Sequence, residues 1–291
     1  MRRRVSLATT LLALSTATAA LTGSLAGTVA SADDAHRGSI VTFGDSYSAN
    51  PDQVHNELRG MVGPIGDWAR NYPTNAAGCL AAPNNIPGKL AQKTGRALHD
   101  WSCVADTSGS MLPRLDAALA AGHISNDSTV VFALGMNDYG GFGLRDNKVN
   151  IFDPIAVNGA YKRNLHAAAD KIRAVAPGAQ IIISGAIPTT DRDTAIFCAV
   201  NVVPNMPAGV PVPYLRDVEN WNRDNQRQAA AEIGATYVEM IDGARGHETC
   251  GPDAQRFVAG FIDTTTPNYT MSAHPSDLGS EYAANTVVAH F

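Results

Sequence analysis

Apolar segments typical of buried strands alternate along the chain with amphipathic segments typical of helices. Within one of these, Tyr161, Leu165, Ala168, Ile172 and Val175 recur every three or four residues, which places them on one helix face. The alternation predicts an α/β fold, a parallel sheet with helices on both faces. The expected strands are 40–43, 97–103, 129–134, 180–184 and 236–241, and the expected helices are 86–94, 111–121, 155–176, 214–233 and 276–289.

The carboxyl ends of parallel strands share one edge of the sheet, so a site there draws on residues far apart in sequence. Ser46 lies at such an end, in Gly44-Asp45-Ser46-Tyr47-Ser48 directly after an apolar run. Backbone N–H groups at the start of the following helix would favour negative charge near its hydroxyl. Ser46 is therefore a candidate nucleophile, although a serine at this place also fits a plain helix cap.

Two further blocks follow expected strands. Asn137, in Gly135-Met136-Asn137-Asp138, could aim its side-chain amide at an oxyanion, or it could simply form a turn. Gly109, in Thr107-Ser108-Gly109-Ser110, could offer a backbone N–H close to a ligand, or it could be a turn glycine.

His274 precedes Pro275 at the start of the last expected helix. Histidine is the usual general base for a serine nucleophile, so His274 is the candidate base. His247, in a polar loop, is the main competitor among the 8 histidines.

The first 32 residues have the pattern of a secretory signal peptide. Three arginines precede an apolar stretch, and Ala30-Ser31-Ala32 is a small-x-small cleavage site. A retained membrane anchor is the alternative, but Thr, Ser and Gly interrupt the apolar stretch. We expect a single mature domain over 33–291, with 19 basic against 27 acidic residues and no Lys/Arg cluster. Nucleic acid is therefore not an expected partner, and no later stretch could span a membrane.

Four cysteines in a secreted chain predict two disulfides. Three pairings are possible, and we favour Cys79–Cys103 with Cys198–Cys250 because each bond closes a segment local to one half of the chain. The chain has no Cys-x-x-Cys and no His-Glu-x-x-His, so no metal is expected. The Pro-, Gly- and Asn-rich segments 49–87 and 189–213 are expected to be long functional or stapled loops.

In the order Ser46, Gly109, Asn137 and His274, these residues resemble the SGNH hydrolases, the GDSL esterase/lipase family. The four-cysteine form looks most like secreted members from high-GC Gram-positive bacteria. The resemblance implies a three-layer α/β/α sandwich with a flavodoxin-like sheet of about five strands. It also implies acyl transfer to Ser46 with His274 as base, and an oxyanion hole of the Ser46 and Gly109 N–H groups and the Asn137 amide.

Two positions depart from the family pattern. Met271 stands where an Asp usually precedes the catalytic His by three residues, so we expect the Met271 carbonyl to orient His274. Asp263 or Asp277 could substitute if the loop folds back. Ala105 stands where members of this type often have the oxyanion-hole glycine, and an Ala N–H could serve in place of Gly109.

The sequence thus predicts a secreted, monomeric serine esterase or lipase that needs no cofactor or metal. Its substrate would be a small-molecule, lipid or acylated-carbohydrate ester. An acyltransferase using the same acyl-enzyme, and a non-catalytic cell-envelope binding module, are the alternatives. An α/β-hydrolase is disfavoured because no Gly-x-Ser-x-Gly is present.

Overall fold

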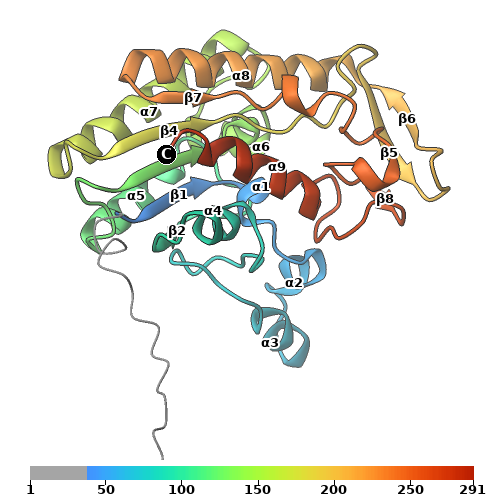
Figure 1. Ribbon diagram of the computed structural model, residues 1–291, viewed down its shortest axis with the longest axis horizontal. Helices are drawn as coiled ribbons and strands as arrows, with labels where there is room; N and C mark the ends of the chain where they lie inside the picture. Colours follow the sequence, from blue (N-terminus) through green and yellow to red (C-terminus); the bar gives the residue numbers. More distant parts are fainter. Residues whose placement is uncertain (1–37) are drawn as a thin grey trace, which may run out of the picture.

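The computed structural model describes residues 38–291, and the expected leader, 1–32, lies outside them. Within the described range a central sheet has the strand order β2-β1-β3-β4-β7, with every neighbouring pair parallel (Figure 1). Counted by themselves, these strands have the order 2-1-3-4-5, which is flavodoxin-like and confirms the predicted fold class. They are β1 (Ile40–Gly44), β2 (Leu98–Asp100), β3 (Thr129–Ala133), β4 (Gln180–Ser184) and β7 (Thr236–Val238).

Helices cover both faces of this sheet, because alternate strand residues point to opposite sides. Val41 and Phe43 pack in one apolar cluster against α5 (Met111–Ala120), α7 (Pro154–Val175) and α8 (Pro213–Ile233). Ile40 and Val131 pack in another against α4 (Ile86–Thr94) and α9 (Asp277–Val288). The result is the predicted three-layer sandwich.

The segments expected to be long loops contain regular structure. Residues 49–87 include α2 (Gln53–Leu58) and α3 (Pro64–Arg70), which lie at one end of the molecule (Figure 1). Residues 189–213 include β5 (Ile196–Asn201) and β6 (Ala208–Pro211), which form a second sheet with β8 (Ile262–Asp263). The short helices α1 (Ser46–Ala49) and α6 (Gly141–Asn147) were also not predicted. Elements this short carry too little periodicity to be recognised in one sequence.

Two disulfides join the cysteines as predicted. Cys79 pairs with Cys103, which follows β2, and Cys198 of β5 pairs with Cys250. Among residues 38–291, none of the helices is long and apolar enough to cross a membrane.

Candidate active site

Ser46 is the first residue of α1 and follows the buried strand β1 after one residue. That residue, Asp45, caps the helix, because its side chain accepts the N–H of Tyr47 at 2.9 Å. A residue in the first turn of a helix has no intrahelical partner for its N–H. The turn therefore holds a half-buried hydroxyl and a backbone donor together at the carboxyl edge of the sheet.

The loop that carries His274 lies directly against this turn. The rings of Tyr47 and His274 are 5.1 Å apart between centroids, and the Tyr47 hydroxyl donates to the Ala273 carbonyl at 3.3 Å. Asn50, which ends α1, donates from its side-chain amide to the Pro275 carbonyl at 2.9 Å. The structure thus brings the two ends of the described chain together at Ser46 and His274.

The carbonyl that orients His274 belongs to Ser272, and the prediction of Met271 was wrong by one residue. Nδ1 of His274 donates to the Ser272 carbonyl at 2.8 Å. Ala273 has a φ of 59°, and this left-handed turn brings the carbonyl two positions back towards the imidazole. The Gln53 side chain also accepts the Ser272 N–H at 2.8 Å, which fixes the peptide from the other side.

This bond decides the protonation pattern of the ring. A carbonyl can only accept, so Nδ1 carries the proton and Nε2 is left with its lone pair. Nε2 is buried and has no hydrogen-bond partner among the described residues. Burial holds the pKa of His274 below its usual value of 6.5, although the bond to the Ser272 carbonyl opposes that shift. The imidazole is therefore neutral at pH 7.

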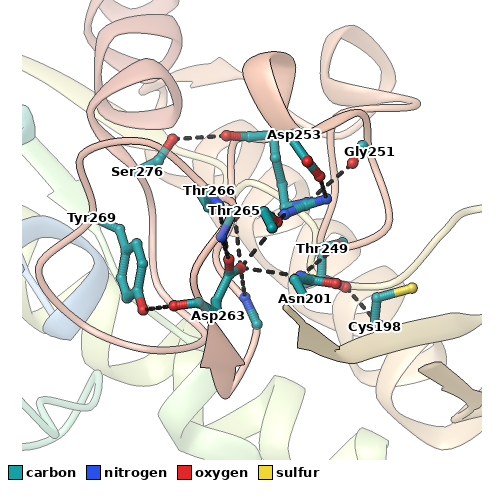
Figure 2. A network of polar contacts seen from close by, with 12 residues as sticks. Cys198, Asn201, Thr249, Gly251, Asp253, Asp263, Thr265, Thr266, Tyr269 and Ser276 are labelled. Carbon is teal, nitrogen blue, oxygen red and sulfur yellow. Dashed lines mark hydrogen bonds and ion pairs between the residues drawn. The ribbon is translucent and has the colours of Figure 1, made fainter. Parts of the chain in front are cut away.

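Asp263 does not contact His274, because other groups saturate its carboxylate (Figure 2). It accepts the N–H groups of Gly260 and Thr266 at 2.8 Å each, and the Asn201 amide at 3.0 Å. Arg256, whose side chain is fully buried, lies 3.6 Å away. The hydrogen bonds outweigh burial and lower the pKa of Asp263 from 3.8, so it is a buried carboxylate.

This network supports the His274 loop from behind. The N–H of Ala259 donates to the His274 carbonyl, and that of Ala273 donates to the Gly260 carbonyl, both at 3.1 Å. Segment 257–260 is therefore a backing strip for 273–276, and the Asp263 carboxylate fixes its end. The other candidate carboxylate, Asp277, lies 2.7 Å from the Lys89 ammonium and has no bond to His274.

Asn137 lies in a 3-10 helix, Met136–Tyr139, just beyond β3. Gly135 before it has a φ of 138°, and a Cβ there would lie 2.2 Å from Oδ1 of Asn222, so only glycine fits. The Asn137 amide donates to the Asp106 carbonyl at 2.9 Å. Ala105, adjacent to Asp106, has a left-handed φ of 67°, a conformation that glycine adopts far more readily than alanine.

Gly109 lies elsewhere in the same loop. A Cβ on Gly109 would lie 2.4 Å from Oδ1 of Asn147 in α6, so close packing against α6 accounts for this glycine. Its neighbour Ser108 donates its N–H to the Asp138 side chain at 3.0 Å. Among the described contacts, none joins Gly109 to Ser46 or Asn137.

Three buried carboxyl groups surround these blocks. Burial raises the pKa of Asp45 to about 7, and that of Asp106 and Asp138 each to about 6. The charges of Asp106 and Asp138 add to the shift at Asp45. Perturbed groups of this kind gather at functional sites because function places charge where burial penalises it.

A narrow cavity of about 30 Å³ lies between α1, α4 and α9. Asp45, Tyr47 and Ser48 border it on one side, and apolar side chains such as Leu90 and Ala283 on the other. It reaches from α4 and α9 along the carboxyl edge of the sheet to Asn222 and Gln226 of α8, and it has room for a methyl group or a water or two. Among residues 38–291, no group of three or more His, Cys, Asp and Glu is placed to hold a metal ion.

Several residues that position the site escaped the sequence analysis, namely Tyr47, Asn50, Gln53 and Ser272. Tyr47, Asn50 and Gln53 contact residues more than 200 positions away, and the bond from His274 to the Ser272 carbonyl depends on the turn at Ala273, so no local sequence pattern marks them. Ala105 could be anticipated from the sequence only by its position two residues after Cys103. His247, the competing histidine, donates from Nδ1 to the Gln255 carbonyl at 2.7 Å and stacks on Phe257.

Comparison with known proteins agrees with this geometry. A model of the GDSL-like Lipase/Acylhydrolase family matches residues 42–282. Lipase 2 of Streptomyces coelicolor is 28% identical over 269 residues, covering 84% of this chain and 82% of that protein. Two solved structures share the fold, each matching 87% of this chain and 98% of its own with a TM-score of 0.54. They are phospholipase A1 from Streptomyces albidoflavus NA297, at 15% identity, and an extracellular lipase from Streptomyces rimosus, at 16%.

Proposed function

Because the chain belongs to the GDSL-like Lipase/Acylhydrolase family, we propose that it is a secreted serine esterase or lipase acting through an acyl-enzyme on Ser46. One observation carries the proposal. The turn with Ser46 touches the loop with His274, whose Nε2 is buried without a hydrogen-bond partner among the described residues. An imidazole with such a free lone pair can act as a general base.

In this mechanism Nε2 of His274 takes the proton of Ser46 as Oγ attacks the ester carbonyl carbon. The tetrahedral intermediate then collapses, and Nε2–H gives the proton to the leaving alcohol. Water repeats the sequence on the acyl-enzyme and releases the acid. The Ser272 carbonyl keeps the proton on Nδ1 throughout. Nε2 therefore offers its lone pair to Ser46 before acylation and to water before deacylation.

The developing oxyanion would be held by the N–H groups of Ser46 and Ala105 and by the Asn137 amide. Ala105 takes the role first given to Gly109, since it adjoins the Asp106 carbonyl that Asn137 contacts. Cys103, two residues earlier, donates to the Gly44 carbonyl at 2.9 Å and so brings this loop beside the Ser46 turn. Loss of one such donor typically costs about 3–4 kcal/mol of transition-state stabilisation.

The apolar cavity beside Tyr47 supports a nonpolar acyl group on the α4–α9 side of the site. Residues 1–32 would direct export and be removed, leaving 33–291 as one hydrolase domain. Two disulfides support an oxidising compartment. Intact-mass and N-terminal analysis of protein from the culture medium tests this part: a mature chain that keeps Arg2 to Arg4 would contradict it.

Turnover of p-nitrophenyl esters from acetyl to palmitoyl tests the function. We expect the wild type and the surface control Ser125→Ala to hydrolyse at least one ester and Ser46→Ala to lose about 10³-fold or more in kcat. Absence of turnover at every chain length, or full activity in Ser46→Ala, would refute the proposal. The best chain length separates a short-chain esterase from a lipase.

A further inference from the structure

A second hollow lies on another side of the candidate site and differs from the apolar cavity in its chemistry. It is a groove of about 670 Å³, between the α2–α3 unit, the Cys79–Cys103 disulfide and α5. Its size is that of a small-molecule site. It is lined by Asn56, Arg59, Gly60, Arg70, Thr74, Gly78, Cys79, Leu80, Cys103, Val104 and Arg114.

Three arginines line this groove and no acidic residue does. The chain as a whole is acidic, with 22 basic and 27 acidic residues, so the arginines are concentrated here against the overall charge. Arg59 directly follows α2 and Arg70 is the last residue of α3; both are exposed, and Arg114 lies in the first part of α5.

The three guanidinium groups keep donors free for a ligand. Arg59 bonds to Asn56 through Nη1 alone, and Arg114 bonds through Nη1 to buried Asp106 and to the Ser110 carbonyl. Arg70 bonds to the Arg59 carbonyl at 2.8 Å and to Asp67, whose side chain is 73% exposed. Among the described residues, no group accepts a hydrogen bond from Nε or Nη2 of Arg59 or of Arg114. Planar groups with several N–H donors that line one groove suit a phosphate oxyanion as ligand.

The groove adjoins the reacting serine. Its wall includes Cys103, whose N–H donates to the Gly44 carbonyl at 2.9 Å. Gly44 precedes Ser46 by two residues, a span of at most about 7 Å. Val104, also in the wall, is followed directly by Ala105 and Asp106 of the oxyanion-hole loop. A ligand in the groove would therefore lie beside an ester bound at Ser46.

The two hollows are separate, because no residue of the described range lines both of them. The apolar cavity is lined by residues of α4, α9 and α8, whereas the groove is lined by Arg114 of α5 and by residues of the α2–α3 unit. An ester with a nonpolar acyl part and an anionic alcohol part matches this division. We propose that Arg59, Arg70 and Arg114 form a subsite for a phosphate group carried by the alcohol part of the substrate. This inference rests on the proposed esterase function.

A matched pair of soluble esters tests the subsite, namely 1-butyrylglycerol 3-phosphate and 1-butyrylglycerol. We expect wild-type kcat/KM to favour the phosphorylated ester by about tenfold or more, the effect of one charge-assisted hydrogen bond. Arg59→Gln, alone and with Arg70→Gln, should abolish that ratio, and Arg59→Lys should restore part of it. Arg227→Gln with Arg245→Gln removes the same charge from exposed sites outside the groove and should keep the ratio.

Equal kcat/KM for the two esters, or a preference that survives in the Arg59→Gln/Arg70→Gln protein, would overturn the inference while p-nitrophenyl ester turnover leaves the esterase function standing. If no ester is hydrolysed, the proposed function fails instead. Calorimetry with glycerol 3-phosphate then tests the groove by itself: binding by the wild type and at least tenfold weaker binding by the double variant support it, and no binding refutes it.

Sedimentation with phosphatidylcholine vesicles containing phosphatidate, compared with soluble glycerol 3-phosphate, separates a lipid headgroup from a free phosphoester.

Discussion

His274 is oriented by a peptide carbonyl, where a serine-hydrolase triad has a carboxylate. The carbonyl selects the same tautomer, with the proton on Nδ1, but supplies only a dipole when the ring becomes charged. In the proposed mechanism, the imidazolium that forms on His274 would therefore be stabilised less than in a triad. Burial adds to this effect and lowers the pKa of His274 from 6.5.

The pH profile of kcat/KM follows from that shift. In the proposed mechanism neutral His274 is the active form, so activity should fall as the pH drops through its lowered pKa and be on a plateau at pH 7. We expect the acid limb to have its midpoint below 6.5 with a soluble p-nitrophenyl ester. A midpoint above 7 would show that a nearby carboxylate raises the pKa of His274 and would contradict the carbonyl arrangement.

The raised pKa of Asp45 predicts how the free energy of unfolding changes with pH. Burial raises the folded-state pKa of Asp45 from 3.8 to about 7, so the folded protein binds a proton that the unfolded chain releases. This contribution to stability is therefore lost as the pH rises from about 4 to 7. Asparagine can still accept the Tyr47 N–H but does not titrate. Urea unfolding at pH 5 and pH 8 should show that Asp45→Asn becomes more stable relative to wild type at the higher pH, by at most about 3 kcal/mol. An unchanged difference between the two proteins would contradict the raised pKa.

The elements that position the catalytic groups are short and irregular. The α1 turn, the start of α2 and the segment 270–276 hold one another through Asn50, Gln53 and Ser272. Behind them Asp263, whose polar network Figure 2 shows, accepts the Gly260 N–H and so fixes the end of the backing strip 257–260. Precision at His274 thus comes from buried polar networks on both sides of its loop.

Asp263→Asn tests the backing strip. Arg256 keeps its 2.7 Å ion pair with Asp253, so the loss comes from the weakened hydrogen bonds to the Asp263 side chain and should destabilise the fold by about 1–3 kcal/mol. The kcat should fall about tenfold through a looser His274, with the acid midpoint of the pH profile in place. Asp277→Asn is the control, because Asp277 pairs with Lys89 and does not contact the backing strip, and it should keep a kcat near that of the wild type. Loss of activity in either variant as severe as in His274→Ala would instead assign that aspartate to the catalytic triad.

For the whole molecule, strand–helix alternation was sufficient to predict the parallel sheet, because each long element carries its own periodicity. The positions of Ser46, Asn137 and His274 at one sheet edge followed from that topology. The Ser272 carbonyl could not be predicted, because the turn at Ala273 decides it and alanine rarely adopts a positive φ. Gly109 was assigned to the oxyanion hole because it is a glycine. The structure explains the need for glycine there by close packing against Asn147.

The Cys198–Cys250 disulfide acts at this scale too, since it ties the second sheet to the chain that leads to the His274 loop. It joins residues 52 positions apart. On a chain-entropy estimate, Cys198→Ala with Cys250→Ala should lower the free energy of unfolding by about 4 kcal/mol, measured by urea denaturation. A change below about 1 kcal/mol would mean that the second sheet is held independently of this bond.

The central claim is that His274, held by the Ser272 carbonyl, activates Ser46. The most direct measurement is the rate and position of labelling by a fluorophosphonate, followed by mass spectrometry of the digested protein. The account predicts one adduct, on Ser46, with labelling abolished in Ser46→Ala and slowed at least 10³-fold in His274→Ala. An adduct on another residue, or equal labelling of the wild type and His274→Ala, would contradict it.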